Sequence, residues 1–182
     1  MIDAYITEKD YTGLLNACEE YELKYDTLMT PILPLTQVYT AYLGSYIIAD
    51  DLHSARFLRK RMLIKAETHQ WALETETETM WQVCAALWKT DYNAAYHFLN
   101  DPTHWSTLIT PMISDILESI RERVVLLLAK AYTTITMDNV ISYFGMQEQD
   151  VVQALSTKGW TYDSTTKTFT TKKLGTYDDP GD

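Results

Sequence analysis

An aspartate followed by an apolar helical pattern occurs three times in this chain, about forty residues apart. The three steps are Asp10-Tyr11, Asp51-Leu52 and Asp91-Tyr92. An aspartate at such a place accepts hydrogen bonds from the free N–H groups of a starting helix and interacts favourably with the helix dipole. The two later copies share an alanine four residues on, Ala55 or Ala95, where a small side chain lets helices approach closely. This spacing predicts antiparallel helix pairs stacked into an array.

Two stretches of the predicted array have clear buried stripes. The segment between Asp26 and Asp50 has no charged residue, but its prolines and threonines make it too polar for a membrane span, so it predicts a loop and then a buried helix. Its stripe comprises Leu35, Val38, Tyr39, Tyr42, Tyr46 and Ile47. The second stretch begins at Thr110 and Pro111, a pair typical of an N-cap and first turn. Its stripe comprises Ile113, Leu117, Ile120, Val124, Leu127, Leu128 and Ala131.

Two arginines, Arg121 and Arg123, interrupt this last helix on faces away from parts of its apolar stripe. Glu118 and Glu122 are their neighbours. The usual behaviour of surface charge predicts solvent-exposed arginines, and a role in an interface is the alternative.

Residues 132–173 form a different pattern, two short helices followed by a hairpin. Apolar residues recur at helical spacing over 137–144, and Gly145 follows where a helix usually stops. A second helical pattern covers about 147–158 and ends before Gly159. The run GWTYDSTTKTFTTKK then alternates β-branched or aromatic residues with polar ones around a turn centred on Asp163 to Thr166. This order predicts a small winged helix.

The chain is therefore predicted to be mainly α-helical. We expect helical repeats of the TPR or HEAT kind over 1–131, a winged helix with a small β-hairpin over 132–173, and a disordered tail over 174–182. The tail sequence LGTYDDPGD contains glycine and proline and has no apolar stripe.

The charge of the winged helix argues against nucleic acid. The helix in the groove-reading position carries Glu148 and Asp150, and the module balances four lysines with four carboxylates. Nucleic-acid binding draws much of its affinity from the neutralisation of phosphates, which a neutral module on a chain of net charge -10 supplies poorly. The same charge disfavours anionic membranes. We predict a protein partner, and keep a winged-helix nucleic-acid binder as the less favoured alternative.

Motifs of catalysis or cofactor binding are absent from the sequence. The four histidines have no metal-binding spacing, and Cys18 and Cys84 lie inside apolar helical patterns, as buried reduced thiols do. The scattered glycines form neither a phosphate-binding loop nor a dinucleotide fingerprint. The acidic run ETETET is most simply a solvated loop or helix start. We predict no catalytic residue, no cofactor and no metal.

Two surfaces are candidates for protein binding. A hairpin that ends a domain leaves an edge strand with unpaired backbone groups, and our candidate edge residues are Thr161, Thr168, Phe169 and Thr170. Trp160, at the start of the hairpin, is predicted to belong to the core and not to an interface, because aromatic residues dominate cores. The alternative is an adaptor that binds peptides on the concave face of the array, around Tyr39, Tyr42, Arg56 and Lys60.

Helical repeats that run through one long helix into a winged helix resemble the PCI domain shared by the proteasome lid, the COP-nine signalosome and initiation factor three. The resemblance covers about 14–173. The stretches that carry it are LLNACEEYEL, ARFLRKR at Ala55, ALWKTDY at Ala86, AYTTI at Ala131 and GWTYDSTT at Gly159. The last is the most specific, and it favours the signalosome branch of the family over the other two.

This resemblance implies a non-catalytic scaffold subunit that joins other PCI subunits in a hetero-oligomer through its winged helix, in the cytoplasm and nucleus. The signalosome removes the ubiquitin-like modifier Nedd from the cullins of cullin-RING ligases, and the zinc isopeptidase chemistry belongs to a different subunit. PCI subunits also normally add a C-terminal helix to a common bundle. No such helix follows Lys173 here, either because the natural protein lacks it or because the chain is truncated.

Overall fold

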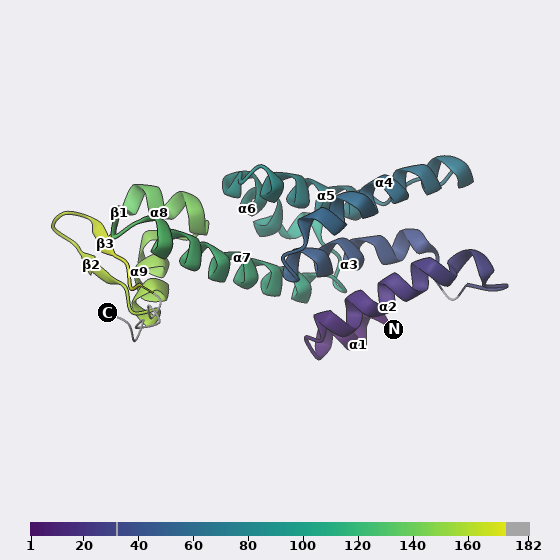
Figure 1. Ribbon diagram of the computed structural model, residues 1–182, viewed down its shortest axis with the longest axis horizontal. Coiled ribbons are helices and arrows are strands. Elements are labelled where there is room, and N and C mark those ends of the chain that lie inside the picture. Colours follow the sequence, from purple (N-terminus) through teal and green to yellow (C-terminus); the bar gives the residue numbers. More distant parts are fainter. Residues whose placement is uncertain (32, 174–182) are drawn as a thin grey trace, which may run out of the picture. The chain divides into compact units, whose positions relative to one another are not determined.

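The computed structural model describes residues 1–31 and 33–173, and the predicted disordered tail over 174–182 lies outside the described residues (Figure 1). Contacts divide the chain into two compact units, Met1–Glu118 and Ser119–Asp182. The first unit contains α1 (Ile2–Thr7), α2 (Tyr11–Lys24), α3 (Leu35–Ile48), α4 (Leu52–His69), α5 (Thr75–Trp88) and α6 (Tyr92–Asn100). The boundary falls within α7 (Thr110–Ala131). The second unit continues with β1 (Thr134–Thr136), α8 (Met137–Phe144), α9 (Glu148–Thr157), β2 (Thr161–Asp163) and β3 (Thr168–Thr170).

The three predicted helix starts are confirmed. Helices α2, α4 and α6 each begin directly after one of the repeated aspartates. The carboxylates accept hydrogen bonds from the backbone N–H groups of Gly13 at 2.9 Å, Ser54 at 3.0 Å and Ala94 at 3.2 Å. Each aspartate thus satisfies an N–H group that the first helical turn would otherwise leave unpaired.

The turn that precedes each capping aspartate is also repeated. Lys9, Asp50 and Thr90 all have left-handed backbone conformations, with φ of 55°, 56° and 55°. The N–H of the next residue, the aspartate itself, bonds in each case to the carbonyl five residues earlier, at 2.8 to 2.9 Å. This is a Schellman turn that closes one helix and is followed at once by the cap of the next. The sequence repeat therefore encodes one helix–turn–cap unit used three times.

Replacing Thr90 by glycine is expected to stabilise the protein by about 1 kcal/mol, because a β-branched residue is strained at a φ of 55° and glycine is not. Urea unfolding of the two proteins measures this difference. Thr90→Ala is the matched control: it removes the same hydroxyl and leaves a Cβ in the left-handed conformation. Equal stability of the glycine and alanine variants would contradict the expectation.

Replacing Asp51 by alanine is expected to lower the free energy of unfolding by about 1 kcal/mol at pH 7. Hydrogen bonds from the Ser54 hydroxyl and N–H lower the pKa of Asp51 from its ordinary value of 3.8. A lowered pKa stabilises the fold above pH 3.8, and this stabilisation is lost as the pH falls through the folded-state pKa. The difference in the free energy of unfolding between the parent protein and Asp51→Ala should therefore be smaller at pH 2.5 to 3 than at pH 7. Asp51→Asn keeps a capping oxygen without a titrating group, and should stay near the parent protein at pH 7.

Helix α3 forms the centre of the first unit. It packs against α2, α4 and α5, and every residue from Val38 to Ile47 is buried. The charge-free sequence explains this position, because a helix surrounded on all sides cannot leave charges in water. The predicted core stripe on α3 is confirmed. Cys18 and Cys84 are also buried, and burial raises the pKa of each thiol to about 12. Across the described residues, every helix is too short or too polar to cross a membrane.

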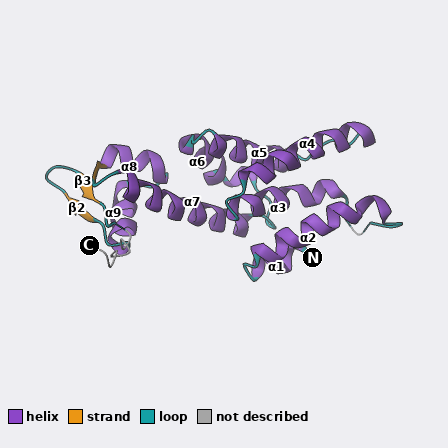
Figure 2. Cartoon of the chain, viewed as in Figure 1, coloured by secondary structure: helices purple, strands orange, loops and turns teal. Residues whose placement is uncertain are grey.

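The second unit contains the predicted winged helix. Its strands form an antiparallel sheet in the order β1-β3-β2. The hairpin of β2 and β3 lies beside α8 and α9 (Figure 2). The hairpin of β2 and β3 is confirmed. Helix α8 ends at Gly145 with φ of 59°, and Gly159, after α9, has φ of 86°, as predicted from their places in the sequence. Strand β1 was not predicted, because three residues between two helices give little strand signal.

The apolar face of the wing packs into its own core. The buried residues are Ile135, Met137, Val140, Phe144, Val151, Leu155, Trp160 and Phe169, together with Ile120, Val124 and Leu128 of α7. The prediction that Trp160 is core is confirmed by its exposed fraction of 3%. The stripe predicted on α7 is wrong at its end, because Leu127 and Ala131 are exposed while Ala129 is buried.

Arg121 is not the solvent-exposed residue that surface statistics predict. Its Nε donates a hydrogen bond to the carbonyl of Phe144 at 2.9 Å. Phe144 is the last residue of α8, whose terminal carbonyls lack helical partners. Arg121 thereby ties α7 to the end of α8, and Arg123 donates to the Ser119 hydroxyl at 2.6 Å.

Candidate functional site

The sheet of the wing has one buried and one exposed face. Ile135, Phe169 and Tyr162 lie opposite one another across the three strands, and the first two are buried. Because side chains alternate along a strand, the residues beside them point to the other face. That face carries Thr134, Thr136, Thr161, Thr168 and Thr170, which we call the threonine face, together with Asp163. All of these except the half-buried Thr168 are exposed. The surface is polar, and Asp163 is its one charged strand residue.

The predicted edge strand is corrected by this topology. Strand β3, with Thr168, Phe169 and Thr170, lies in the middle of the sheet and pairs on both sides. Its backbone groups are therefore not available to a neighbour. Phe169 is also 1% exposed and packs against Tyr162 at 4.7 Å between ring centroids, so its side chain belongs to the core. Thr161, on β2, is the one predicted edge residue that lies on an outer strand.

The open edge of β2 presents the backbone of Tyr162. The N–H groups of Thr171 and Met137 donate to the carbonyls of Thr133 and Lys167 at 2.9 Å, which places the backbone groups of odd-numbered β3 residues toward β1. Alternation then directs the even-numbered residues Thr168 and Thr170 toward β2. The β2 partners of these two residues are Thr161 and Asp163. Tyr162 lies between them and directs its N–H and C=O away from β3. The N–H and C=O of Tyr162 can therefore form backbone hydrogen bonds with one residue of a strand from a partner.

The exposed surface of α9 carries no arginine or lysine. Glu148 and Asp150 lie exposed in its first turn, where carboxylates favourably meet the positive end of the helix dipole. A DNA-reading helix places its first residues against base edges and phosphates. Two carboxylates there would repel the backbone of a nucleic acid. The two carboxylates predicted in the groove-reading position are thus on the surface, and their place in the first turn stabilises α9.

A hollow of about 430 Å³ lies beside the wing, between α7 and the end of α9. Its apolar lining comprises Val125, Leu126, Ala129 and Trp160. Glu122, Lys158 and Lys172 add charged groups to the lining. Leu126 is 43% exposed, so this apolar surface of the second unit is open.

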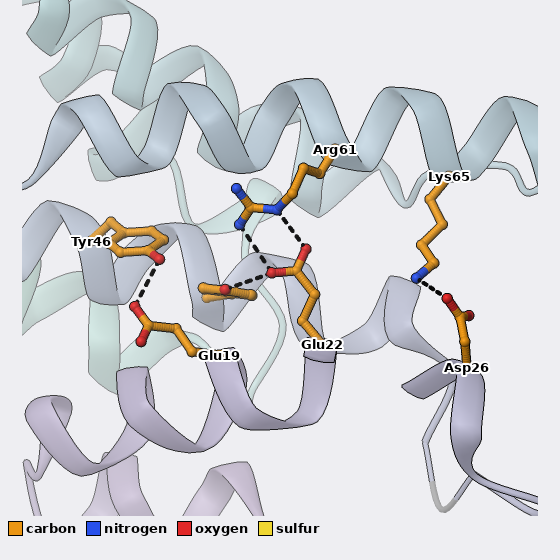
Figure 3. A network of polar contacts seen from close by, with 7 residues as sticks. Glu19, Glu22, Asp26, Tyr46, Arg61 and Lys65 are labelled. Atoms are coloured by element: carbon orange, nitrogen blue, oxygen red, sulfur yellow. Dashed lines mark hydrogen bonds and ion pairs between the residues drawn. The ribbon is translucent and has the colours of Figure 1, made fainter. Parts of the chain in front are cut away.

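A second candidate site is a groove of about 770 Å³ in the first unit, between α2 and α4 and over α3 (Figure 3). Ion pairs bridge it. The Arg61 guanidinium binds both carboxylate oxygens of Glu22 at 2.9 Å, and Lys65 binds Asp26 at 2.9 Å. In each pair the carboxylate precedes the cation by 39 residues, close to the repeat spacing. This spacing is a signal from which sequence reasoning could have predicted the pairs.

Two tyrosines of α3 complete the network of the groove. Tyr42 donates to Glu22 at 2.8 Å. Tyr46 donates to Glu19 at 2.9 Å (Figure 3). Burial, and then the bond to Glu22, raises the pKa of Tyr42, and burial raises the pKa of Tyr46 to about 12. Both hydroxyls therefore remain protonated donors at neutral pH. The network joins α2, α3 and α4, with Glu22 and Asp26 paired to cations and both hydroxyls protonated.

The residues predicted for a peptide-binding concave face do not form one surface. Tyr39 and Tyr42 are 0% and 1% exposed, because α3 is the central helix of the first unit. The Tyr39 hydroxyl is buried without a hydrogen-bond partner among the described residues. Arg56 and Lys60 are exposed on α4 and do not line the groove. That prediction is therefore wrong in grouping the tyrosines with the two cations.

The acidic run ETETET starts a helix. Helix α5 begins at Thr75, and Thr77 is buried against Thr40, with 2.8 Å between their hydroxyl oxygens. Glu78 forms a bidentate pair with Arg59, and Glu76 accepts a bond from the N–H of Ser106. Within residues 1–31 and 33–173, three or more metal-ligating side chains do not gather at any point.

The family model described as the CSN8/PSMD8/EIF3K family matches residues 34–176, so the chain belongs to this family. The chain is 28% identical to the COP9 signalosome complex subunit 8 of Xenopus tropicalis over 166 residues, which cover 90% of this chain and 80% of that relative. It is 30% identical to the Arabidopsis thaliana protein of the same name over 135 residues, 74% of this chain and 66% of the relative. The predicted resemblance to the signalosome branch is confirmed.

Proposed function

We propose that this chain is a non-catalytic scaffold subunit of the COP9 signalosome, and that it joins other PCI subunits through its winged helix. Two relatives named as signalosome subunit 8 align over most of this chain, which supports membership of the same assembly. The proposal includes that the assembly in which this chain is a scaffold removes the modifier Nedd from cullins.

The threonine face is the observation that favours the wing as the contact surface. Its threonines are exposed apart from the half-buried Thr168, and it is almost uncharged on a chain of net charge -10. Threonine hydroxyls donate and accept hydrogen bonds, and removing them from water costs far less than removing charges. The centre of a protein interface is likewise depleted of charged residues. The open edge at Tyr162 offers backbone hydrogen bonds beside it.

A nucleic-acid partner is disfavoured by the same surfaces. The threonine face lacks cations, and the exposed carboxylates of α9 stand where such a module would meet a phosphate backbone. The four lysines of the wing are balanced by its four carboxylates. A module with no net positive charge does not neutralise phosphates, and this neutralisation supplies the salt-dependent part of the affinity for a duplex.

Affinity purification of the tagged full chain from its native source, followed by mass spectrometry, tests the proposal. We expect several other PCI subunits in near-equal amounts. The Thr161→Lys/Thr170→Lys variant provides the comparison, because its altered residues lie only on the wing. Recovery of PCI subunits with the parent chain and their loss with the variant would support the proposal. Recovery of none with the parent chain would refute it.

A further inference from the structure

The outward face of α4 carries a stripe of apolar and cationic side chains. The stripe comprises Arg56, Phe57, Lys60, Leu63 and Ile64, which we call the α4 stripe. These residues occupy helical positions i, i+1, i+4, i+7 and i+8, so they share one side of the helix. The exposed fraction is 59% for Phe57, 47% for Leu63 and 65% for Ile64. Single exposed apolar residues are ordinary, but three on one side of a helix mark a candidate interaction surface.

The last residue of α5 extends this surface. Trp88 is 39% exposed, and the Arg56 guanidinium lies 4.2 Å from the centroid of its ring. The His53 ring meets the same indole edge to face, with centroids 4.8 Å apart. Stacking holds these side chains in place before a partner arrives, which lowers the entropy lost on binding.

The charge of the α4 stripe is not neutralised within the protein. Helix α4 has five cations between Arg56 and Lys65, and Arg59, Arg61 and Lys65 are paired with Glu78, Glu22 and Asp26. Arg56 and Lys60 have no carboxylate within 4.0 Å among the described residues, and lie instead over the rings of Trp88 and Phe57. A chain with ten more acidic than basic residues thus leaves two neighbouring cations unpaired beside an exposed apolar row.

We infer that the α4 stripe binds an amphipathic helix of another protein, with an apolar ridge against Phe57 and Ile64 and carboxylates against Arg56 and Lys60. The spacing of the stripe matches the ridge that one helix presents to another. Carboxylates on the partner would give the two cations the pairs that they lack in this chain. The inference does not rest on the proposed wing assembly, because α4 belongs to the first unit and the wing to the second.

Two other occupants fit less well. A second copy of this chain that docked stripe to stripe would bring Arg56 and Lys60 against the same cations, and like charges in an interface oppose binding. Nucleic acid would meet only two unpaired cations on α4, since carboxylates neutralise the other three. Both are outcomes that the experiment below distinguishes.

Fluorescence anisotropy with two labelled helical peptides tests the inference on the full chain. One peptide has a leucine ridge flanked by glutamates, and the other has lysine in place of every glutamate. We expect the glutamate peptide to bind at least about tenfold more tightly at low salt, and the difference to shrink in 0.5 M NaCl. The double variant Arg56→Glu/Lys60→Glu should reverse this preference. A reversal requires a folded protein, so it distinguishes lost charge complementarity from unfolding.

The apolar part is tested with Ile64→Ser, which should weaken binding of the glutamate peptide at least about tenfold. Leu127→Ser is the matched control, because Leu127 is 48% exposed in the other unit. Equal affinity for the two peptides, no binding of either, or an unchanged preference in the double variant would overturn the inference. So would self-association abolished by Ile64→Ser in sedimentation, or tighter binding of a duplex RNA that displaces the peptide.

Discussion

Lysine at both Thr161 and Thr170 is expected to weaken binding of the neighbouring PCI subunit by at least about a hundredfold. The two threonines face each other across β2 and β3 on the threonine face. An interface that covers them would bury two ammonium groups without partners, which costs several kcal/mol, and about 2.7 kcal/mol is a hundredfold in affinity. Both side chains are exposed in the free chain, so its thermal unfolding should change little. Co-purification and titration with the neighbouring subunit measure the effect.

The control for this variant is Thr165→Lys, in the turn of the same hairpin. It adds a lysine to the wing outside the three strands of the sheet. Equal loss of binding in the control would show that charge on the wing in general is harmful, and wild-type binding in the double variant would contradict the threonine face as the interface.

Replacing Phe169 by alanine is expected to lower the stability of the wing by about 3 to 5 kcal/mol. Phe169 is 1% exposed on the middle strand, and it contacts Tyr162 and Trp160 with ring centroids 4.7 and 6.3 Å apart. Its removal leaves a cavity where both outer strands meet the core. Because the wing belongs to its own compact unit, we expect local unfolding. Hydrogen exchange should show lost protection at the amides of Met137 and Thr171, with helix α3 unchanged.

Phe57→Ala is the matched control for this loss, since it removes the same ring from a position that is 59% exposed. Exposed substitutions typically change stability by no more than about 0.5 kcal/mol. A similar cost for the two variants, or equal loss of protection in α3 and in the wing, would contradict the assignment of Phe169 to a separate wing core.

Features with a local cause could be predicted from the sequence. The caps at Asp10, Asp51 and Asp91 depend on residues within three positions, and Gly145 depends on the backbone of one turn. The buried stripe of α3 follows from apolar residues that recur every three or four positions in the sequence. In each case the contacts that select the structure lie close together in sequence.

Features that depend on distant partners could not be predicted in this way. Thr134–Thr136 is a strand because β3, more than thirty residues later, supplies its hydrogen bonds. This third strand is also why Thr168 and Thr170 lie in the middle of the sheet. Arg121 looked like an ordinary surface arginine, because its acceptor on Phe144 is adjacent only in the fold.

The candidate surfaces illustrate the same limit. Thr161 and Thr170 were predicted as edge residues, whereas their common property is the exposed face that strand alternation gives them. Arg56 and Lys60 were grouped with tyrosines that are buried in the centre of the first unit. The ring beside Arg56 is Trp88 of α5, which is adjacent only in the fold, whereas Lys60 lies over Phe57, three residues earlier on the same helix.

Hydrogen exchange of the chain, free and within its assembly, tests the central proposal most directly. If the wing is the contact surface, the Tyr162 amide on the open edge of β2 should exchange more slowly in the assembly, and peptides that span the threonine face should gain protection. The exposed amides in the hairpin turn, Ser164 to Thr166, should change less. Identical exchange across 134–136 and 161–170 in the free and assembled chain would contradict assembly through the wing.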